Sequence, residues 1–96
     1  MSADPAPAEL FVLELYVTGQ TPRSLRAVVN IRKVCEERLH DRYQLEVVDV
    51  YQQPQLAARE QLVAAPTLVK RQPLPERRMV GDMSDRQRLL FGLGIV

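Results

Sequence analysis

The spacing of hydrophobic and polar positions along the chain predicts a strand followed by a long helix. Residues 10–17 are mostly apolar and alternate at their start, which is typical of a strand with one well-buried face. Thr21 is a favourable N-cap residue, and Pro22 is a favourable first residue of a helix. From Pro22 to about His40, apolar side chains recur at the spacing of an amphipathic helix. The predicted apolar face consists of Leu25, Val28, Ile31, Cys35 and Leu39.

A second strand is predicted over residues 44–51, which are rich in valine. A right-handed crossover through the helix sets this strand parallel to the first one. Residues 10–51 are therefore expected to form a βαβ unit.

Prolines divide the second half of the chain into short segments whose intrinsic preferences are weak. The pattern predicts a short helix from Pro54 to about Ala64. Two strands are predicted over residues 67–71 and 77–80, and the turn between them contains Pro73 and Pro75.

The end of the chain fits two conformations. Ser84 and Gln87 form a capping box, which predicts a last helix. Gly92 and Gly94 each cost a helix interior about 1 kcal/mol relative to alanine, so residues 89–96 also fit an apolar strand. The leucines expected on the buried face of the helix are Leu89, Leu90 and Leu93.

Length and composition suit a small soluble protein. With 96 residues the chain is expected to form a single domain over residues 10–96. Residues 1–9 are rich in alanine and proline, which predicts a flexible tail and not a signal peptide. No apolar run approaches the roughly 18 residues that cross a bilayer. The one cysteine, Cys35, excludes an intramolecular disulfide, and we expect a cytoplasmic protein without a membrane partner.

The charge balance argues against nucleic acid as a partner. The formal net charge is +1, whereas sequence-independent binding to nucleic acid needs many phosphate contacts. The few aromatic residues, without any tryptophan, offer no obvious platform for stacking bases.

The sequence gives little support for catalysis or a metal ion. Cys35 lies on the predicted apolar face, which indicates a buried structural thiol. His40 is the only histidine, and a zinc site needs three or four ligands. Asp82 and Asp85 flank the predicted start of the last helix, where negative charge is favourable, and with Asp49 they form no recognisable acid–base set. We therefore expect neither an enzyme nor a bound cofactor.

Basic residues are more suggestive of a function. If residues 67–80 form a hairpin beside the βαβ unit, several guanidinium groups lie on or near one sheet edge. Arginine pairs well with carboxylates and is enriched at interfaces, although a solvated charged surface explains the same residues. The basic residues are Arg26, Lys70, Arg71, Arg77, Arg78, Arg86 and Arg88.

The predicted order of elements resembles a thioredoxin-like α/β (α+β) fold. Redox enzymes of this architecture carry a Cys-x-x-Cys pair in the turn after the first strand, where the helix N-terminus lowers a thiol pKa. Here residues 19–22 read Gly-Gln-Thr-Pro, so both cysteine positions are empty. The thioredoxin-like fold of this chain is expected to have a function other than electron transfer.

Several blocks of sequence, in this order and at this spacing, resemble the KaiB family over residues 10–93. The blocks are residues 15–22, 46–50, 54–57, 65–70 and 77–85. The resemblance implies a non-enzymatic regulator of a circadian clock or timing system. It also implies that the partner is a KaiC-type ATPase ring, bound after that ring is phosphorylated.

The resemblance further implies a metamorphic C-terminal half. Family members have a dimeric or tetrameric ground state with the order βαββααβ, and a rare monomer switches to the thioredoxin-like order βαβαββα. The switched form docks on the ATPase and, in cyanobacterial systems, sequesters KaiA and displaces a sensor histidine kinase. Prolines and glycines in this half make two packings of similar free energy physically reasonable. The expected hinge positions are Pro66, Pro73, Pro75, Gly92 and Gly94.

Matching family positions implies that four basic residues contact a partner or the homo-oligomer, namely Arg26, Lys70, Arg77 and Arg78. Gly94 departs from the family pattern, because clock-type members commonly carry an acidic residue there, and this leaves KaiA open as a partner. Two alternatives remain: a thioredoxin-like redox or stress protein that uses Cys35, and a detached KaiB-like sensor module of a histidine kinase.

Overall fold

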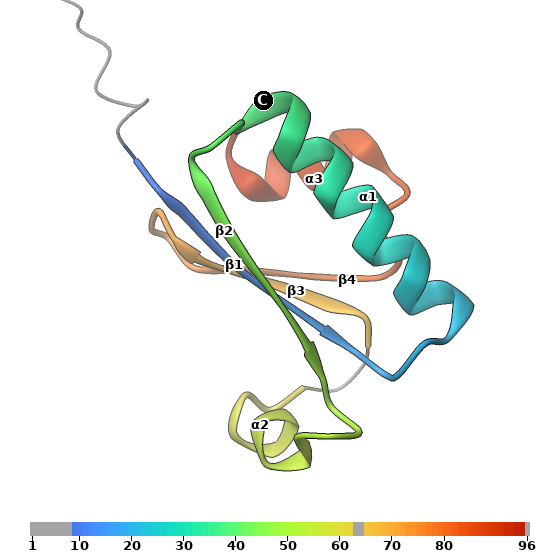
Figure 1. Cartoon of the computed structure of the whole chain (residues 1–96). Coiled ribbons are helices and arrows are strands. Elements are labelled where there is room, and N and C mark those ends of the chain that lie inside the picture. The colour runs from blue at the N-terminus through green and yellow to red at the C-terminus, as the bar shows by residue number, and fades with distance from the viewer. Residues whose placement is uncertain (1–8, 63–64, 96) are drawn as a thin grey trace, which may run out of the picture.

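The computed structural model describes residues 9–62 and 65–95 and has a four-stranded sheet with helices on both faces (Figure 1). The strand order is β2-β1-β3-β4, in which β1 runs parallel to β2 and antiparallel to β3, and β3 runs antiparallel to β4. This is the predicted thioredoxin-like order βαβαββα. The elements are β1 (Phe11–Val17), α1 (Pro22–Arg38), β2 (Tyr43–Asp49), α2 (Pro54–Arg59), β3 (Thr67–Gln72), β4 (Arg77–Val80) and α3 (Arg86–Leu93).

Strand β1 lies inside the sheet, and both of its faces are covered. Its alternating apolar residues pack against α1 and α3 in the larger core, as the sequence predicted. On the other face, Tyr16 packs with Val48 and Val69 in a smaller core that α2 covers through Leu56. The larger core therefore fixes α1 and α3 to one face, and α2 covers only part of the other (Figure 1).

Helix α1 begins as the sequence predicted. The Thr21 side chain accepts a hydrogen bond from the Ser24 N–H at 3.3 Å, and Pro22 is the first residue of the helix. The predicted buried face was wrong at Leu25, which is 51% exposed. Two smaller residues lie against the sheet instead, because they allow the helix to approach it closely and the Ser24 hydroxyl accepts a hydrogen bond from the Thr18 N–H. The buried residues of α1 are Ser24, Ala27, Ile31, Val34 and Cys35.

Helix α2 is shorter than the sequence predicted. It ends at Arg59, and the predicted continuation reaches residues 63–64, which lie outside the described residues. No residue of α2 is fully buried. The prolines indicated that this segment has only a weak preference for helix, and the helix that forms is also weakly packed.

Helix α3 resolves the ambiguity at the end of the chain in favour of a helix. Its N-cap is Asp85, whose carboxylate accepts a hydrogen bond from the Arg88 N–H at 3.1 Å, so the predicted capping box at Ser84 was wrong. Gly94 is also not a helix-interior residue. It ends the helix in the left-handed conformation with φ of 79°, where a glycine is favourable. The three predicted leucines are buried.

The expected hinge residues lie at or between these elements, except for Gly92. Pro66 is buried directly before β3, and Pro73 and Pro75 form the turn between β3 and β4. Gly92 lies within α3, where the Met79 side chain of β4 occupies the space that a β-carbon would need. The close approach of Met79 gives a packing reason for glycine at this position.

Candidate partner-binding surface

The structure places the four predicted basic residues in three different locations. Lys70 and Arg77 are cross-strand partners in the β3–β4 register and line one hollow beside α3. Arg78 belongs to the opposite face of the sheet, where it contacts the end of α2. Arg26 lies on α1. The two exposed arginines of β4 do lie on the sheet edge, as expected from the hairpin, but they point to different faces.

Arg26 ties α1 to the loop between β4 and α3. Its Nε lies 3.1 Å from Oδ2 of Asp82, while the Asn30 side chain donates to the Asp82 carbonyl oxygen at 2.9 Å. The other oxygen of the Asp82 carboxylate accepts a hydrogen bond from the Ser84 N–H. Hydrogen bonds from Ser84 and Arg26 lower the Asp82 pKa. The Arg26 side chain is still 55% exposed, so it remains open to a second carboxylate.

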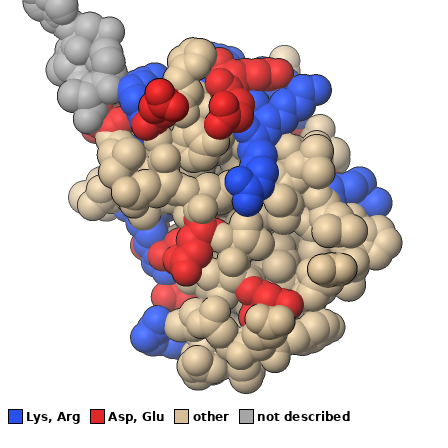
Figure 2. Space-filling view, in the orientation of Figure 1, with Lys and Arg blue, Asp and Glu red and all other residues tan. Residues whose placement is uncertain are grey.

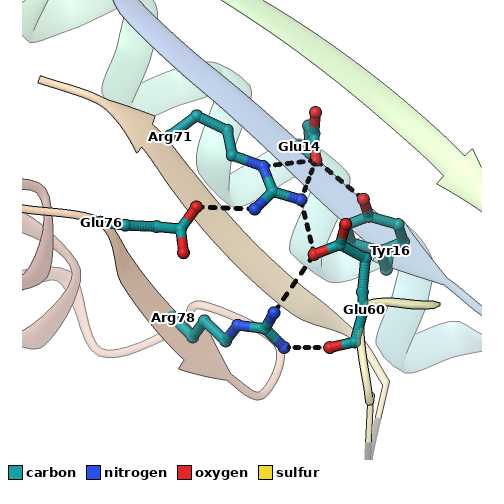
Figure 3. A network of polar contacts seen from close by, with 6 residues as sticks. All are labelled: Glu14, Tyr16, Glu60, Arg71, Glu76 and Arg78. Carbon is teal, nitrogen blue, oxygen red and sulfur yellow. Dashed lines mark hydrogen bonds and ion pairs between the residues drawn. The ribbon is translucent and has the colours of Figure 1, made fainter. Parts of the chain in front are cut away.

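A network of polar contacts joins the end of α2 to three strands of the sheet (Figure 3). Arg71 lies at its centre: Nη2 is 2.8 Å from Oε1 of Glu14 and 2.6 Å from Oε1 of Glu60, and Nη1 is 2.6 Å from Oε2 of Glu76. Arg78 contacts the same Glu60 through both its carboxylate and its backbone carbonyl oxygen, at 3.2 and 2.7 Å. The members of this network are Glu14, Tyr16, Glu60, Arg71, Glu76 and Arg78.

The network shifts the pKa of Glu60 and of Tyr16 in opposite directions. The hydrogen bond from Arg71 lowers the Glu60 pKa, and the two arginines stabilise the carboxylate further by their charge. Burial raises the pKa of Tyr16 to about 12, with a further contribution from the hydrogen bond that its hydroxyl donates to Glu14 at 2.7 Å. Arg71 uses its donors within the chain, so we regard the network as an anchor for α2 and not as a ligand site.

Sequence reasoning identified the arginines of this network but missed its acidic residues. One signal was available, because Glu14 is the single charged residue in the otherwise apolar strand. The strand pairing places it opposite Val69, two residues before Arg71 on β3. No local pattern marks Glu60 or Glu76, which meet Arg71 only through the tertiary fold.

The other acidic candidates have structural contacts in the fold. Asp49 accepts hydrogen bonds from the N–H groups of Gly19 and Tyr51 and so links the β1–α1 turn to the end of β2. Asp82 and Asp85 support the loop before α3. Within residues 9–62 and 65–95, no group of His, Cys, Asp and Glu side chains is placed to hold a metal ion. In the same ranges, no helix is long and apolar enough to span a membrane.

Charged side chains of both signs are interspersed on the face shown in Figure 2, with no broad area of a single sign. Elsewhere in the fold, Arg86 of α3 pairs with Glu37 of α1 at 2.6 Å. On the face drawn in Figure 2, this mixture of signs favours contacts between individual charged groups over binding of a polyanion.

We predict that the Cys35 thiol does not react in the folded protein. Cys35 is fully buried in the larger core, and this burial raises its pKa to about 12, so very little reactive thiolate forms at neutral pH. An aromatic disulfide reagent should modify it only at the rate of global unfolding, and immediately in denaturant. Rapid labelling of the native protein would contradict this prediction and would favour the alternative of a redox protein that uses Cys35.

Comparisons with known proteins agree with the fold and with the sequence blocks. The KaiB domain family matches residues 14–95. The chain is 47% identical to the circadian clock protein KaiB3 of Synechocystis sp. over 88% of this chain and 83% of the relative. It is 43% identical to the circadian clock oscillator protein KaiB of Synechococcus elongatus over 95% of this chain and 89% of the relative.

Solved structures give the same result. The N-terminal domain of Synechococcus elongatus SasA matches with a TM-score of 0.73 and 28% identity over 91% of this chain and 86% of that domain. Chloroplastic thioredoxin z matches with a TM-score of 0.74 and 19% identity over 94% of this chain and 81% of its own, which shows the fold alone. The elements, the family match and the similarity to curated clock proteins lead to one conclusion: this chain belongs to the KaiB family.

Proposed function

We propose that this chain is a non-enzymatic clock regulator that binds a KaiC-type ATPase ring and adjusts the timing of its phosphorylation cycle. The observation that carries the proposal is the family membership over residues 14–95, together with identities above 40% to circadian clock proteins. The buried Cys35 and the empty cysteine positions speak against a redox role.

Arg77 is the residue we propose as a direct contact with the partner. It is exposed on the edge strand β4 and forms no ion pair with another side chain in the described part of the chain. Arg78 and Arg26 are already paired with Glu60 and Asp82, so a partner carboxylate would have to share them. An exposed arginine with free donors is well suited to bind a carboxylate across an interface.

We propose in addition that the C-terminal half exchanges with the second packing implied by the family. The weak packing of α2 supports this, since none of its residues is fully buried and a half-buried ion-pair network holds its end. In this proposal the backbone changes direction at Pro66, Pro73, Pro75, Gly92 and Gly94. A free homo-oligomer in the other packing and a thioredoxin-like monomer on the ATPase would then be two states of one chain.

The complex is the direct test. Mixed with the KaiC-type ATPase of the same organism, the protein should form a complex in one phosphorylation state, detected by native mass spectrometry. Arg77→Glu should weaken this complex at least tenfold, because it replaces an attraction with a repulsion. The matched control is Arg32→Glu, at an exposed position of α1, which should leave the affinity for the ATPase unchanged. If no complex forms in any phosphorylation state, the proposal that this chain binds the ATPase is wrong.

A second candidate is the detached sensor module of a histidine kinase system, which the similarity to the SasA N-terminal domain favours. A sensor module of this kind would be a monomer that keeps the thioredoxin-like packing. Amide spectra recorded by NMR over days distinguish the two candidates, because a switching chain shows a second set of resonances and a sensor module shows one.

A further inference from the structure

A pocket of about 290 Å³ lies where α3 ends beside the β3–β4 turn. This volume is near the lower end of the range of about 300–1,000 Å³ that is typical of small-ligand sites. Its walls combine apolar side chains with two cations. We call it the α3 pocket, and the residues used below are Phe11, Lys70, Leu74, Arg77, Phe91 and Leu93.

The apolar walls come from both ends of the described chain. Phe11 and Leu93 are buried and form the wall toward the larger core. Leu74 and Phe91 are 80% and 69% exposed and stand at the mouth. Exposed large apolar side chains beside a hollow are typical of a surface that a ligand covers. The pocket therefore offers a buried apolar wall and two apolar side chains that could close over an occupant.

Lys70 is the unusual feature of the α3 pocket. Its side chain is buried, with 4% of the residue exposed, and it forms no hydrogen bond or ion pair with any residue in the described ranges. Its ammonium nitrogen keeps some contact with solvent, since no side-chain nitrogen of the described residues is both fully buried and without a hydrogen-bond partner, so the charge is desolvated only in part. Its Nζ lies 3.7 Å from the position that a β-carbon of Gly94 would take, so the dipole at the C-terminus of α3 stabilises it in part.

The charged residues around Lys70 give the pocket an excess of positive charge. Arg77 lies across from Lys70 in the strand register and brings a second positive charge to the same pocket. Burial and then the charge of Arg77 lower the Lys70 pKa. The acidic residue at the rim is Glu9, whose charge acts on Lys70 from a distance without an ion pair. The pocket thus holds more positive than negative charge beside apolar walls.

We propose that the α3 pocket binds a small organic carboxylate with an apolar body. The carboxylate lies between Lys70 and Arg77 and supplies Lys70 with an ion pair that residues 9–62 and 65–95 do not provide, while the apolar body packs on Phe11 and Phe91. A charge-assisted contact with two cations fixes the orientation, and burial of the apolar body provides affinity. The site shares Arg77 with the proposed ATPase contact, but it needs no second protein, so binding of the small carboxylate is measured on the isolated chain.

The test uses 4-phenylbutyrate as the probe, with acetate and 4-phenylbutyramide as matched probes that lack the apolar body or the charge. Binding is followed by amide shifts in NMR spectra of the full chain and by calorimetry. We expect 4-phenylbutyrate to shift the amides of residues 70–77 and 91–95 and to bind at least tenfold more tightly than either matched probe. Equal binding of the carboxylate and the amide, or no binding at millimolar concentration, would overturn the proposal.

Variants of the chain distinguish binding in the α3 pocket from nonspecific binding to the surface. The sequence has two lysines, Lys33 on exposed α1 and Lys70 in the pocket, so Lys70→Met and Lys33→Met make the same chemical change in two environments. Lys70→Met and Arg77→Met should each weaken 4-phenylbutyrate binding about tenfold, and Lys33→Met should not.

Glu9→Gln provides a test with the opposite sign. It removes the acidic group at the rim and should tighten binding several-fold, because the ligand no longer meets its negative charge. Weaker binding by Glu9→Gln, or unchanged binding by both Lys70→Met and Arg77→Met, would contradict the assignment of the site.

Discussion

Replacing Leu93 with alanine should lower the free energy of unfolding by about 3 kcal/mol. Leu93 is fully buried in the larger core, where α3 meets the sheet and α1. Removing its side chain loses the transfer free energy of the deleted carbons and leaves a cavity, since the neighbours relax only in part. The change should appear in urea denaturation followed by circular dichroism, as a lower midpoint with an unchanged slope.

Phe91→Ala is the matched control on the same helix. Phe91 is 69% exposed, so the substitution removes a large apolar side chain without opening a cavity in the core. Its effect on the free energy of unfolding should stay within about 0.5 kcal/mol. If the two variants were equally destabilised, the burial of one face of α3 described here would be wrong, and the strand alternative for residues 89–96 would have to be reconsidered.

Replacing Arg71 with methionine should lower the free energy of unfolding by about 2 kcal/mol at neutral pH. The guanidinium pairs with three carboxylates, and its side chain is 25% exposed. Methionine keeps much of the aliphatic volume but leaves Glu14, Glu60 and Glu76 close together without their common cation. The full cost of breaking a buried pair is larger, and partial exposure to water reduces it here.

The effect of Arg71→Met should depend on pH with a definite sign. The Glu60 pKa is lowered in the folded protein, so the unfolded chain binds a proton at higher pH than the folded chain does. The stabilisation from this carboxylate is present above the ordinary value of 4.5 and is lost as the pH falls through the folded pKa. The difference between wild type and variant should therefore be largest near neutral pH and shrink in acid.

Arg32→Met is the control for the Arg71 variant. Arg32 is exposed on α1, so its replacement makes the same chemical change at a site outside the network. It should shift the stability by a few tenths of a kcal/mol at every pH. A loss for Arg71→Met that grew in acid would show that another group dominates the pH dependence.

The network also explains how a helix with little buried surface is held in place. Leu56 is the one residue of α2 in the smaller core, and it is only partly buried. The paired Glu60 at the end of α2 makes up for this with contacts to Arg71 and Arg78 on two different strands. Loss of these contacts should release α2 before the larger core unfolds, and hydrogen exchange of the α2 amides should be faster in Arg71→Met.

Local patterns predicted the first half of the chain well because its signals agree with one another. Thr21 and Pro22 mark the start of α1, and the valines near residues 47–50 mark β2. The predicted apolar face of α1 was wrong at Leu25, whereas Ile31, Cys35 and Leu39 are buried as predicted. The first turns of the helix instead bury Ser24 and Ala27, whose small side chains permit close packing.

The second half was predicted in outline, and its errors concern the two ends of α3. The capping residue of α3 is Asp85 and not Ser84, since both residues are good caps and the preceding loop decides between them. The cost assigned to Gly94 was wrong for a related reason. A glycine at the end of a helix and a glycine inside it look alike in sequence, and only the position of the end separates them.

The sequence by itself determined the order of elements up to β4, the apolar face of β1, the burial of Cys35 and the family. These depend on local spacing, capping chemistry and ordered sequence blocks, all of which are present before the chain folds. Only the tertiary structure decided that the basic residues lie in three separate places, that Arg71 gathers carboxylates from distant segments, and that Lys70 is buried in a pocket. Strand pairing places Lys70 and Arg71 on opposite faces of the sheet, and long-range packing then supplies or withholds a counter-charge, which no local pattern encodes.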